Sequence, residues 1–188
     1  IAACGATRVD ELEYRGAYSL IGIKGGSALA EMALPSAGGV AEVTARHEFE
    51  HEAYEMTINC SSYDLGLVTT FSVNGDDLDI TPQRGMNLVV LHPTGAVDSF
   101  YTFDTHEDGS EPLVAVVEGL PIGTTVMLST HDEARSGLSL DAMQAIASCG
   151  AKDIASLVYR GAYALIGVKG GQALAEHTEA SGVVTISA

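Results

Sequence analysis

The stretch that decides the fold is "YRGAYALIGVKGG", residues 159–171, because nearly the same phrase, "YRGAYSLIGIKGG", stands at residues 14–26. When residues 1–31 are aligned with residues 146–176 at a constant offset of 145, 21 of the 31 positions are identical. Chance does not produce a match of this length. The offset of 145 residues exceeds the period of solenoid repeats, so it predicts tandem copies of a whole domain.

The offset also predicts where the units meet. We expect residues 1–45 to be the C-terminal part of a preceding unit and residues 46–188 to be one complete unit. Residues 1–5 correspond to the end of a predicted helix at residues 146–150. A helix end this short is not stable alone. We therefore expect residues 1–45 to add strands to the complete unit or to a neighbouring chain.

Composition narrows the class of protein. Of the 188 residues, 46% are hydrophobic and 18% are charged, which is typical of a folded domain and not of a disordered chain. The formal net charge is −16, and such a surface repels nucleic acid and anionic membranes. No apolar run approaches the ~20 residues that a membrane-spanning helix needs. We therefore expect no nucleic-acid partner and no direct membrane insertion.

The complete unit alternates strand and turn patterns. Polar and apolar residues alternate, or β-branched and apolar residues gather, over six segments, and these predict strands. The segments are residues 54–60, 67–73, 124–130, 156–160, 163–171 and 182–188. Two further strands are predicted within residues 84–104, on either side of a turn at residues 92–95.

Two helices are predicted from their ends. Ser110 is placed to cap a helix over residues 111–118, and Ser139 to cap one over residues 140–148. Gly150 then ends the second helix, because a glycine tolerates the left-handed conformation that follows a helix.

An ordered series of short motifs resembles one protein family. The series comprises residues 84–87 (RGMN), the Phe103-Asp104 pair, the Gly123-Thr124 pair, the Asp132 turn and the Arg160…Gly167-x-Lys169-Gly170 ending. In this order and spacing, residues 54–171 resemble the domain of the interleukin-like EMT inducer and pancreatic-derived factor proteins, the ILEI/PANDER or "GG" domain.

The resemblance implies a compact α+β fold with two β-sheets and flanking helices, about two per unit. It implies a secreted, extracellular or organelle-luminal protein. Family members are cytokine-like factors, or modules attached to glycan-processing enzymes, for which sugar binding has been proposed. The family offers no established catalytic residues to carry over.

Two acidic turns are the first candidate site. Asp104 and His106 follow one predicted strand, and His131 and Asp132 follow another, so both turns could open at the same end of a sheet. Carboxylates converging there would suit Ca²⁺, and His–Asp pairs would suit acid–base chemistry. The simpler interpretation, which we favour, is turn chemistry in which Asp104 and Asp132 bond local backbone N–H groups.

Arg160 and Lys169 are the second candidate, as cations in an acidic chain. The Gly-Val-Lys-Gly-Gly ending lacks the Lys-Ser/Thr of a phosphate loop, so we expect both cations to form internal ion pairs. The segment "HEFEH", residues 47–51, matches a zinc-protease motif in letters only. Its period of two would put the histidines on a strand roughly 13 Å apart, so we interpret it as a solvated connection.

The cysteines leave two interpretations open. Cys4 and Cys149 occupy equivalent positions, and Cys60 is the third. A Cys60–Cys149 disulfide is one hypothesis, and buried thiols acting as small hydrophobic groups are the other.

Two classes of function remain. We favour a non-catalytic binding or scaffolding module of a tandem-repeat protein or polyprotein, acting as an interaction domain or a structural subunit. Its partners would be other copies of the domain, a larger assembly or a glycan. The alternative is a metal-dependent hydrolase or calcium-binding domain at the Asp104 and Asp132 turns. Because no nucleophile–base pair has a recognisable spacing, we predict neither catalytic activity nor a cofactor.

Overall fold

The computed structural model describes residues 17–22, 28–34 and 53–188. The chain divides into two compact units, Ile1–Glu50 and His51–Ala188.

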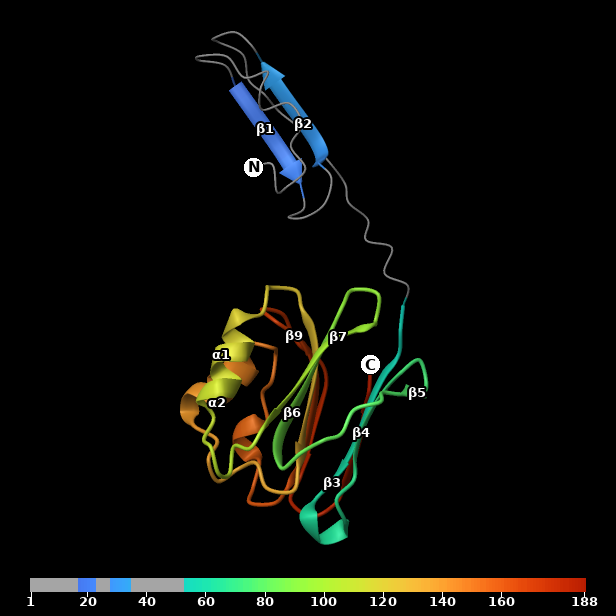
Figure 1. Cartoon of the computed structure of the whole chain (residues 1–188), viewed down its shortest axis with the longest axis vertical. Helices are drawn as coiled ribbons and strands as arrows, with labels where there is room; N and C mark the ends of the chain where they lie inside the picture. The colour runs from blue at the N-terminus through green and yellow to red at the C-terminus, as the bar shows by residue number, and fades with distance from the viewer. Residues whose placement is uncertain (1–16, 23–27, 35–52) are drawn as a thin grey trace. The chain divides into compact units, whose positions relative to one another are not determined.

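The described part of the first unit is a hairpin. Strand β1 (Ala17–Gly22) pairs antiparallel with strand β2 (Ala28–Leu34), as Figure 1 shows in blue. The helix end predicted at residues 1–5 and the "HEFEH" segment at residues 47–51 lie outside the described residues.

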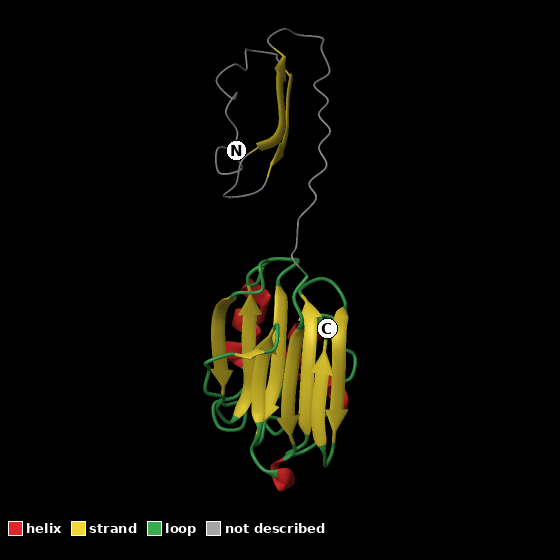
Figure 2. Ribbon diagram, turned by 90° about the vertical axis from the view of Figure 1, so that its right-hand side faces the viewer, coloured by secondary structure: helices red, strands yellow, loops and turns green. Residues whose placement is uncertain are grey.

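The second unit has three layers: two helices, a five-stranded sheet and a four-stranded sheet (Figures 1 and 2). The five-stranded sheet has the order β10–β9–β8–β6–β7, with every neighbouring pair antiparallel. Its strands are β6 (Gly85–Leu91), β7 (Val97–Phe103), β8 (Thr125–His131), β9 (Ala162–Val168) and β10 (Ala173–Glu179). The predicted α+β class with a two-sheet core is confirmed.

The four-stranded sheet covers one face of the first. Its order is β11–β3–β4–β5, again antiparallel throughout. Its strands are β3 (Met56–Ser61), β4 (Thr69–Val73), β5 (Asp76–Asp77) and β11 (Val183–Ser187). The strands predicted near residues 54–60, 67–73 and 182–188 are therefore β3, β4 and β11.

Strand β9 shows why the central strands β6, β8 and β9 are buried at nearly every position. Successive side chains of a strand point to opposite faces of the sheet. Tyr163 and Leu165 pack in the cluster under the helices, whereas Ala164 and Ile166 pack between the two sheets. Because both faces are covered, the alternating pattern of a half-exposed strand is absent, and the sequence is a continuous apolar run.

Helix α2 (Leu140–Ala147) begins and ends as its sequence predicts. The Ser139 hydroxyl oxygen accepts a hydrogen bond from the backbone N–H of Ala142 at 3.2 Å. Gly150 follows with φ = +97°, in the left-handed region. Both ends of this helix are therefore set by local sequence.

Helix α1 (Glu111–Gly119) begins where predicted, but its cap was assigned wrongly. Ser110 stands at the N-cap position without a side-chain capping bond. Its hydroxyl donates to Ser139 Oγ at 2.9 Å and accepts from the Ser139 backbone N–H at 3.0 Å. Ser110 therefore ties the starts of the two helices together instead of capping its own.

Two strand predictions need correction. Residues 156–160, predicted as a strand, contain the end of a 3₁₀ turn (Ile154–Ser156) and an Arg160 with φ = +57°. Leu157 is buried but Val158 and Tyr159 are both exposed, so burial does not alternate as it does along a strand, and the chain turns there. Strand β10 was not predicted.

A buried tyrosine joins β9 to β10 and to the loop after α2. The Tyr163 hydroxyl donates to Glu176 Oε1 at 2.6 Å. The same carboxylate accepts from the backbone N–H groups of Lys152 at 2.8 Å and Asp153 at 3.0 Å. Burial, and then the hydrogen bond to the Glu176 carboxylate, raise the pKa of Tyr163. The phenol therefore stays neutral and acts as a donor.

We expect Tyr163→Phe to lower the free energy of unfolding by about 1.5–3 kcal/mol, because a hydrogen bond to a charged group is lost in a buried site. Urea denaturation measures the change. Tyr101→Phe, on the more exposed strand β7 (36% exposed), is the control and should change stability little. Equal losses in the two variants would contradict the role of the Tyr163 hydroxyl.

A second pair of variants tests the close approach of the α2–β9 loop to the sheet. A Cβ added at Gly167 would collide with the backbone carbonyl oxygen of Cys149, whereas one added at Gly119 meets nothing within 4 Å. Gly167→Ala should cost about 1–3 kcal/mol of stability through overpacking. Gly119→Ala should be neutral or slightly stabilising. Thermal denaturation that ranks them in the reverse order would refute this packing.

Candidate functional site

The two acidic turns lie at the same end of the five-stranded sheet. The register pairs Met86 with Phe103 and Gly85 with His131. The end of β7, the end of β8 and the start of β6 are therefore adjacent. Asp104 and Asp132 each come directly after one of these strand ends.

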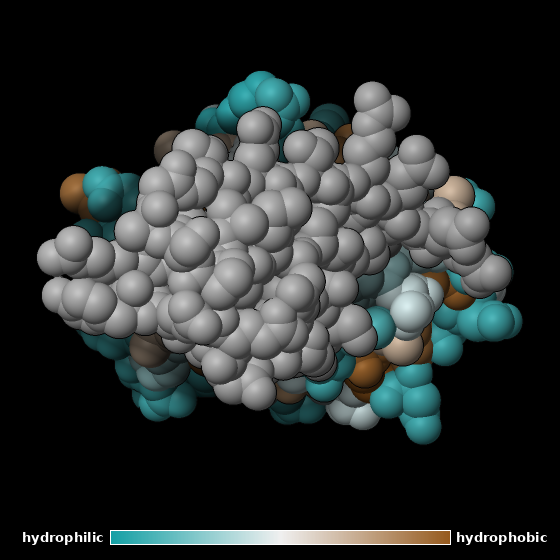
Figure 3. All heavy atoms as spheres, turned by 90° about the horizontal axis from the view of Figure 1, so that it is seen from above, coloured by the Kyte–Doolittle hydropathy of each residue, from teal (hydrophilic) through white to brown (hydrophobic). Residues whose placement is uncertain are grey.

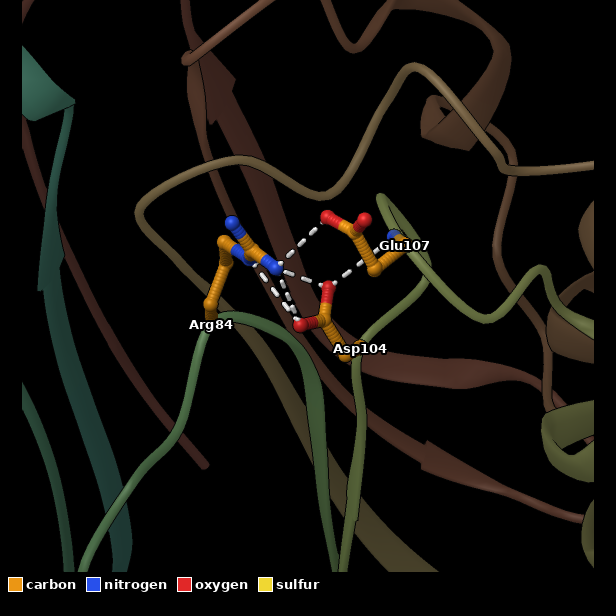
Figure 4. Close-up of polar contacts among 3 residues, drawn as sticks. All are labelled: Arg84, Asp104 and Glu107. Atoms are coloured by element: carbon orange, nitrogen blue, oxygen red, sulfur yellow. Dashed lines mark hydrogen bonds and ion pairs between the residues drawn. The ribbon is translucent and has the colours of Figure 1, made fainter.

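Asp104 is engaged by Arg84, a residue that sequence analysis did not single out as a site (Figure 4). The Arg84 guanidinium donates from Nε at 3.1 and 3.0 Å to the two carboxylate oxygens of Asp104, and from Nη2 at 2.6 Å to Oδ2. Nη2 also contacts Glu107 Oε2 at 3.2 Å. The Arg84 hydrogen bonds hold the pKa of Asp104 below its usual range.

The expected local role of Asp104 is present as well. Its Oδ1 accepts a hydrogen bond from the Glu107 backbone N–H at 3.2 Å. The carboxylate thus closes its own turn while it binds Arg84. His106, in the middle of this turn, is exposed, and the contacts described here do not involve its side chain.

His131 faces the other sheet instead of the acidic turn after β7. Its Nδ1 lies 3.0 Å from Thr69 Oγ1, and that hydroxyl also lies 3.0 Å from the backbone oxygen of Thr130. Burial lowers the pKa of His131, and the nearby Asp132 carboxylate opposes this in part. The imidazole therefore links β8 to the start of β4.

Glu133 is the buried carboxylate of this end, only 2% exposed. Its Oε1 accepts from the backbone N–H groups of Arg135 and Ser136, each at 2.7 Å. Its Oε2 accepts from the Arg160 backbone N–H at 2.6 Å. Glu133 follows Asp132 in the predicted turn, but no local pattern indicated that its carboxylate would hold the distant backbone of Arg160.

Arg160 forms the ion pair that was expected, but in a loose geometry. Its Nε lies 3.8 Å from Asp132 Oδ1, and neither of these two atoms has a hydrogen-bond partner. The guanidinium carbon lies 3.8 Å from the centre of the Tyr63 ring and 5.3 Å from that of Tyr159. A cation over an aromatic face is the main contact of this side chain.

Lys169 does not belong to this end of the sheet. It follows β9 at the opposite end, where its Nζ donates to Ser148 Oγ at 2.6 Å, close to the C-terminus of α2. A cation is stabilised there by the helix dipole. The expected ion pair of Lys169 is replaced by this hydrogen bond, and Lys169 and Arg160 do not form one site.

The acidic turns do not form a metal site in the part of the chain that the structure describes. There, no three His, Cys, Asp or Glu side chains gather closely enough to hold a metal ion. Asp104 is engaged by Arg84, and Glu133 by backbone N–H groups. The hydrolase or calcium-binding alternative is therefore not supported.

The hypothesis of a Cys60–Cys149 disulfide needs correction. Both thiols are free and buried. Cys60 packs between the two sheets and lies 3.4 Å from the Tyr163 backbone oxygen, whereas Cys149 packs under the helices. The five-stranded sheet separates the two side chains. Burial raises the pKa of both thiols.

Large apolar side chains are exposed around the Arg160 stack. Two segments supply them: the loop between β3 and β4, and the loop before β9. We call this set the Tyr63–Arg160 surface. Its members are Tyr63, Leu65, Leu67, Val68, Val158, Tyr159 and Arg160, of which the six apolar side chains are 42–59% exposed. The backbone N–H of Tyr63 donates to the Arg160 carbonyl oxygen at 3.1 Å and joins the two segments.

The lowered pKa of His131 predicts a pH dependence. The unfolded state takes up the proton first as the pH falls, so the contribution of neutral His131 to stability is full above about pH 6.5 and is lost at lower pH. Between about pH 7.5 and about pH 5, His131→Asn should lose less stability than the wild type in urea denaturation. His106→Asn, at an exposed histidine, should behave like the wild type. Equal acid sensitivity of the wild type and His131→Asn would refute the prediction.

Comparisons with known proteins agree with the sequence motifs. The model of the family described as interleukin-like EMT inducer matches residues 84–171. A cell surface hyaluronidase of the zebrafish Danio rerio is 41% identical over 92 residues, which is 47% of this chain and 7% of that protein. Human protein FAM3B is 29% identical over 89 residues, which is 46% of this chain and 38% of that protein.

The chain thus spans well under half the length of either relative. Family members are cytokine-like, secreted proteins. None of the helices in the described residues is long and apolar enough to cross a membrane. The fold, the ordered motifs and the family match together confirm the resemblance to the interleukin-like EMT inducer (ILEI/PANDER) domain over residues 84–171.

Proposed function

We propose that this chain is a non-catalytic interaction domain of a secreted protein, and that it binds a protein partner through the Tyr63–Arg160 surface. One observation carries the proposal. At this end of the sheet Asp104 is bound by Arg84 and Glu133 by backbone N–H groups, while the large apolar side chains of the Tyr63–Arg160 surface remain exposed.

The composition of this surface supports a protein partner. Tyrosine and arginine are the residues that most often dominate the binding energy of protein interfaces. Here the Arg160 guanidinium lies over the Tyr63 ring and near the Tyr159 ring, and exposed leucine and valine side chains belong to the same two segments. Contiguous exposed apolar side chains of this kind commonly mark an interaction site.

A sugar ligand is the second candidate, because one relative is named a cell surface hyaluronidase. Two observations argue against it here. Sugars stack on exposed aromatic faces, and one face of Tyr63 is covered by the Arg160 guanidinium at 3.8 Å. The formal net charge of −16 also repels an anionic polysaccharide.

In Figure 3 the visible described residues are mostly hydrophilic, with hydrophobic atoms in small groups.

The lengths of the relatives suggest where a partner is found. The matched part of the zebrafish protein is 7% of its length, so the matching segment is one small part of a much larger protein. A neighbouring domain of the same polypeptide is therefore an available partner in such a protein. The same surface serves equally well between separate chains.

The experiment selects binders from a phage-displayed random peptide library on the full chain. We expect peptides that bind the wild type to lose at least about tenfold in affinity, or about 1.4 kcal/mol, for the double variant Tyr63→Ser/Tyr159→Ser. The control is Ile122→Ser/Leu140→Ser, at two residues that are more exposed (78% and 75%) and lie before β8 and at the start of helix α2. Selected peptides that bind the Tyr63/Tyr159 variant as well as the wild type would exclude the surface.

Hyaluronan oligosaccharides are the probe for the competing functions. If the chain is a protein-binding domain, it should release no reducing ends from these oligosaccharides. Adding them should also leave the NMR chemical shifts of Tyr63 and Tyr159 unchanged. Shifts confined to that surface would favour the glycan. Turnover that disappears in His131→Asn would favour an enzyme.

A further inference from the structure

The hairpin β1–β2 repeats the hairpin β9–β10 in backbone as well as in sequence. Adding the offset of 145 to the bounds of β2 gives those of β10, and adding it to β1 gives the first six residues of β9. Ala17 pairs with Leu34 as Ala162 pairs with Glu179, and all six pairs of the first hairpin recur in the second.

The irregularity within the hairpin recurs at the same place. In β1–β2 the register shifts between Ile21 and Gly22, so that Leu29 is passed over. In β9–β10 the shift falls at the equivalent pairs, and Leu174 is passed over. A bulge fixes the twist and the register of a strand pair. The two hairpins are therefore built to take the same place in the same kind of sheet.

Strand β9 has a neighbouring strand on each of its two edges. Strand β9 pairs with β10 on one side and with β8 on the other, where Met127 lies opposite Ile166 and Ser129 opposite Ala164. Among the strands that the structure describes, β1 pairs with β2 alone. β1 therefore has a second edge, which faces away from β2. This edge is the counterpart of the edge of β9 that pairs with β8.

The sequence of β1 is that of an interior strand. It reads AYSLIG, and the first six residues of β9 read AYALIG. All six of those β9 residues are buried. An apolar strand with an open edge invites pairing with another strand, and a two-stranded hairpin is marginally stable alone.

We propose that the edge of β1 that faces away from β2 accepts a strand of the β8 type from another copy of this domain, so that β1 and β2 become part of a second five-stranded sheet. The incoming strand runs antiparallel to β1. The counterpart of Met127 then lies opposite Ile21, and the counterpart of Ser129 opposite Ser19.

The sequences AYSLIG and AYALIG differ at one position, and this difference predicts the relative stability of the two sheets. Ser19 stands where β9 has Ala164, which is fully buried between the two sheets. A hydroxyl in that place costs stability unless it finds a hydrogen-bond partner. The second sheet is therefore expected to be less stable than the described one, and Ser19→Ala should stabilise it.

The test adds a copy of residues 46–145 in front of residue 1 of the full chain. Because Ile1 corresponds to Ile146, the junction continues the repeat without a gap. Hydrogen exchange is then followed at the amides of β1, with those of β9 as the internal reference. We expect the β1 amides to exchange at least about 100-fold more slowly in the extended protein than in the 188-residue chain.

Two variants of the extended protein complete the design. Leu128→Pro in the added copy alone breaks its β8-type strand and should return the β1 amides to fast exchange, with β9 unchanged. Ser19→Ala should slow the β1 amides further. Fast exchange of β1 in the extended protein overturns the proposal. So does slow, concentration-dependent exchange in the 188-residue chain, which would show that β1 pairs between chains in another way.

Discussion

The covering of strand β9 on all sides is the constraint on which the second unit depends. Its neighbours β8 and β10 take both edges, the helices cover one face and the four-stranded sheet covers the other. Every side chain must therefore fit a fixed space. Small Ala164 lets the two sheets approach, and large Tyr163 fills the layer under the helices. Gly167 is needed because the Cys149 backbone passes where a side chain would be.

The elements that could be predicted are those whose signal is local. Strands β6 and β8 each contain a run of apolar residues, at residues 88–91 and 126–128, and helix α2 carries its cap and its terminating glycine in its own sequence. Strand β10 has the sequence ALAEHTE and is half-buried, so its polar residues hide the strand signal. Residues 157–160 are mostly apolar or aromatic but do not form a strand, because Glu133 holds the backbone of Arg160 in a turn from another part of the chain.

The candidate site shows a similar division. Sequence analysis located the titratable groups at one end of the sheet, because strand ends can be placed from the turns that follow them. Whether a carboxylate is available depends on partners that are distant in sequence. Arg84 lies 20 residues from Asp104, and Thr69 lies 62 residues from His131. No local pattern indicates these contacts, so the engagement of Asp104 could not be predicted.

The backbone around Arg160 argues that the Tyr63–Arg160 surface is preorganised. Asp132 and Arg160 both adopt φ = +57°, a conformation that costs a residue other than glycine roughly 1–3 kcal/mol. The cost is offset by the bond from the Arg160 N–H to Glu133 and by the bond from the Tyr63 N–H to the Arg160 carbonyl. These contacts fix the guanidinium over the Tyr63 ring without any ligand. A surface whose side chains are already ordered loses little entropy on binding. Strain kept at this exposed stack is therefore consistent with the interaction surface proposed above.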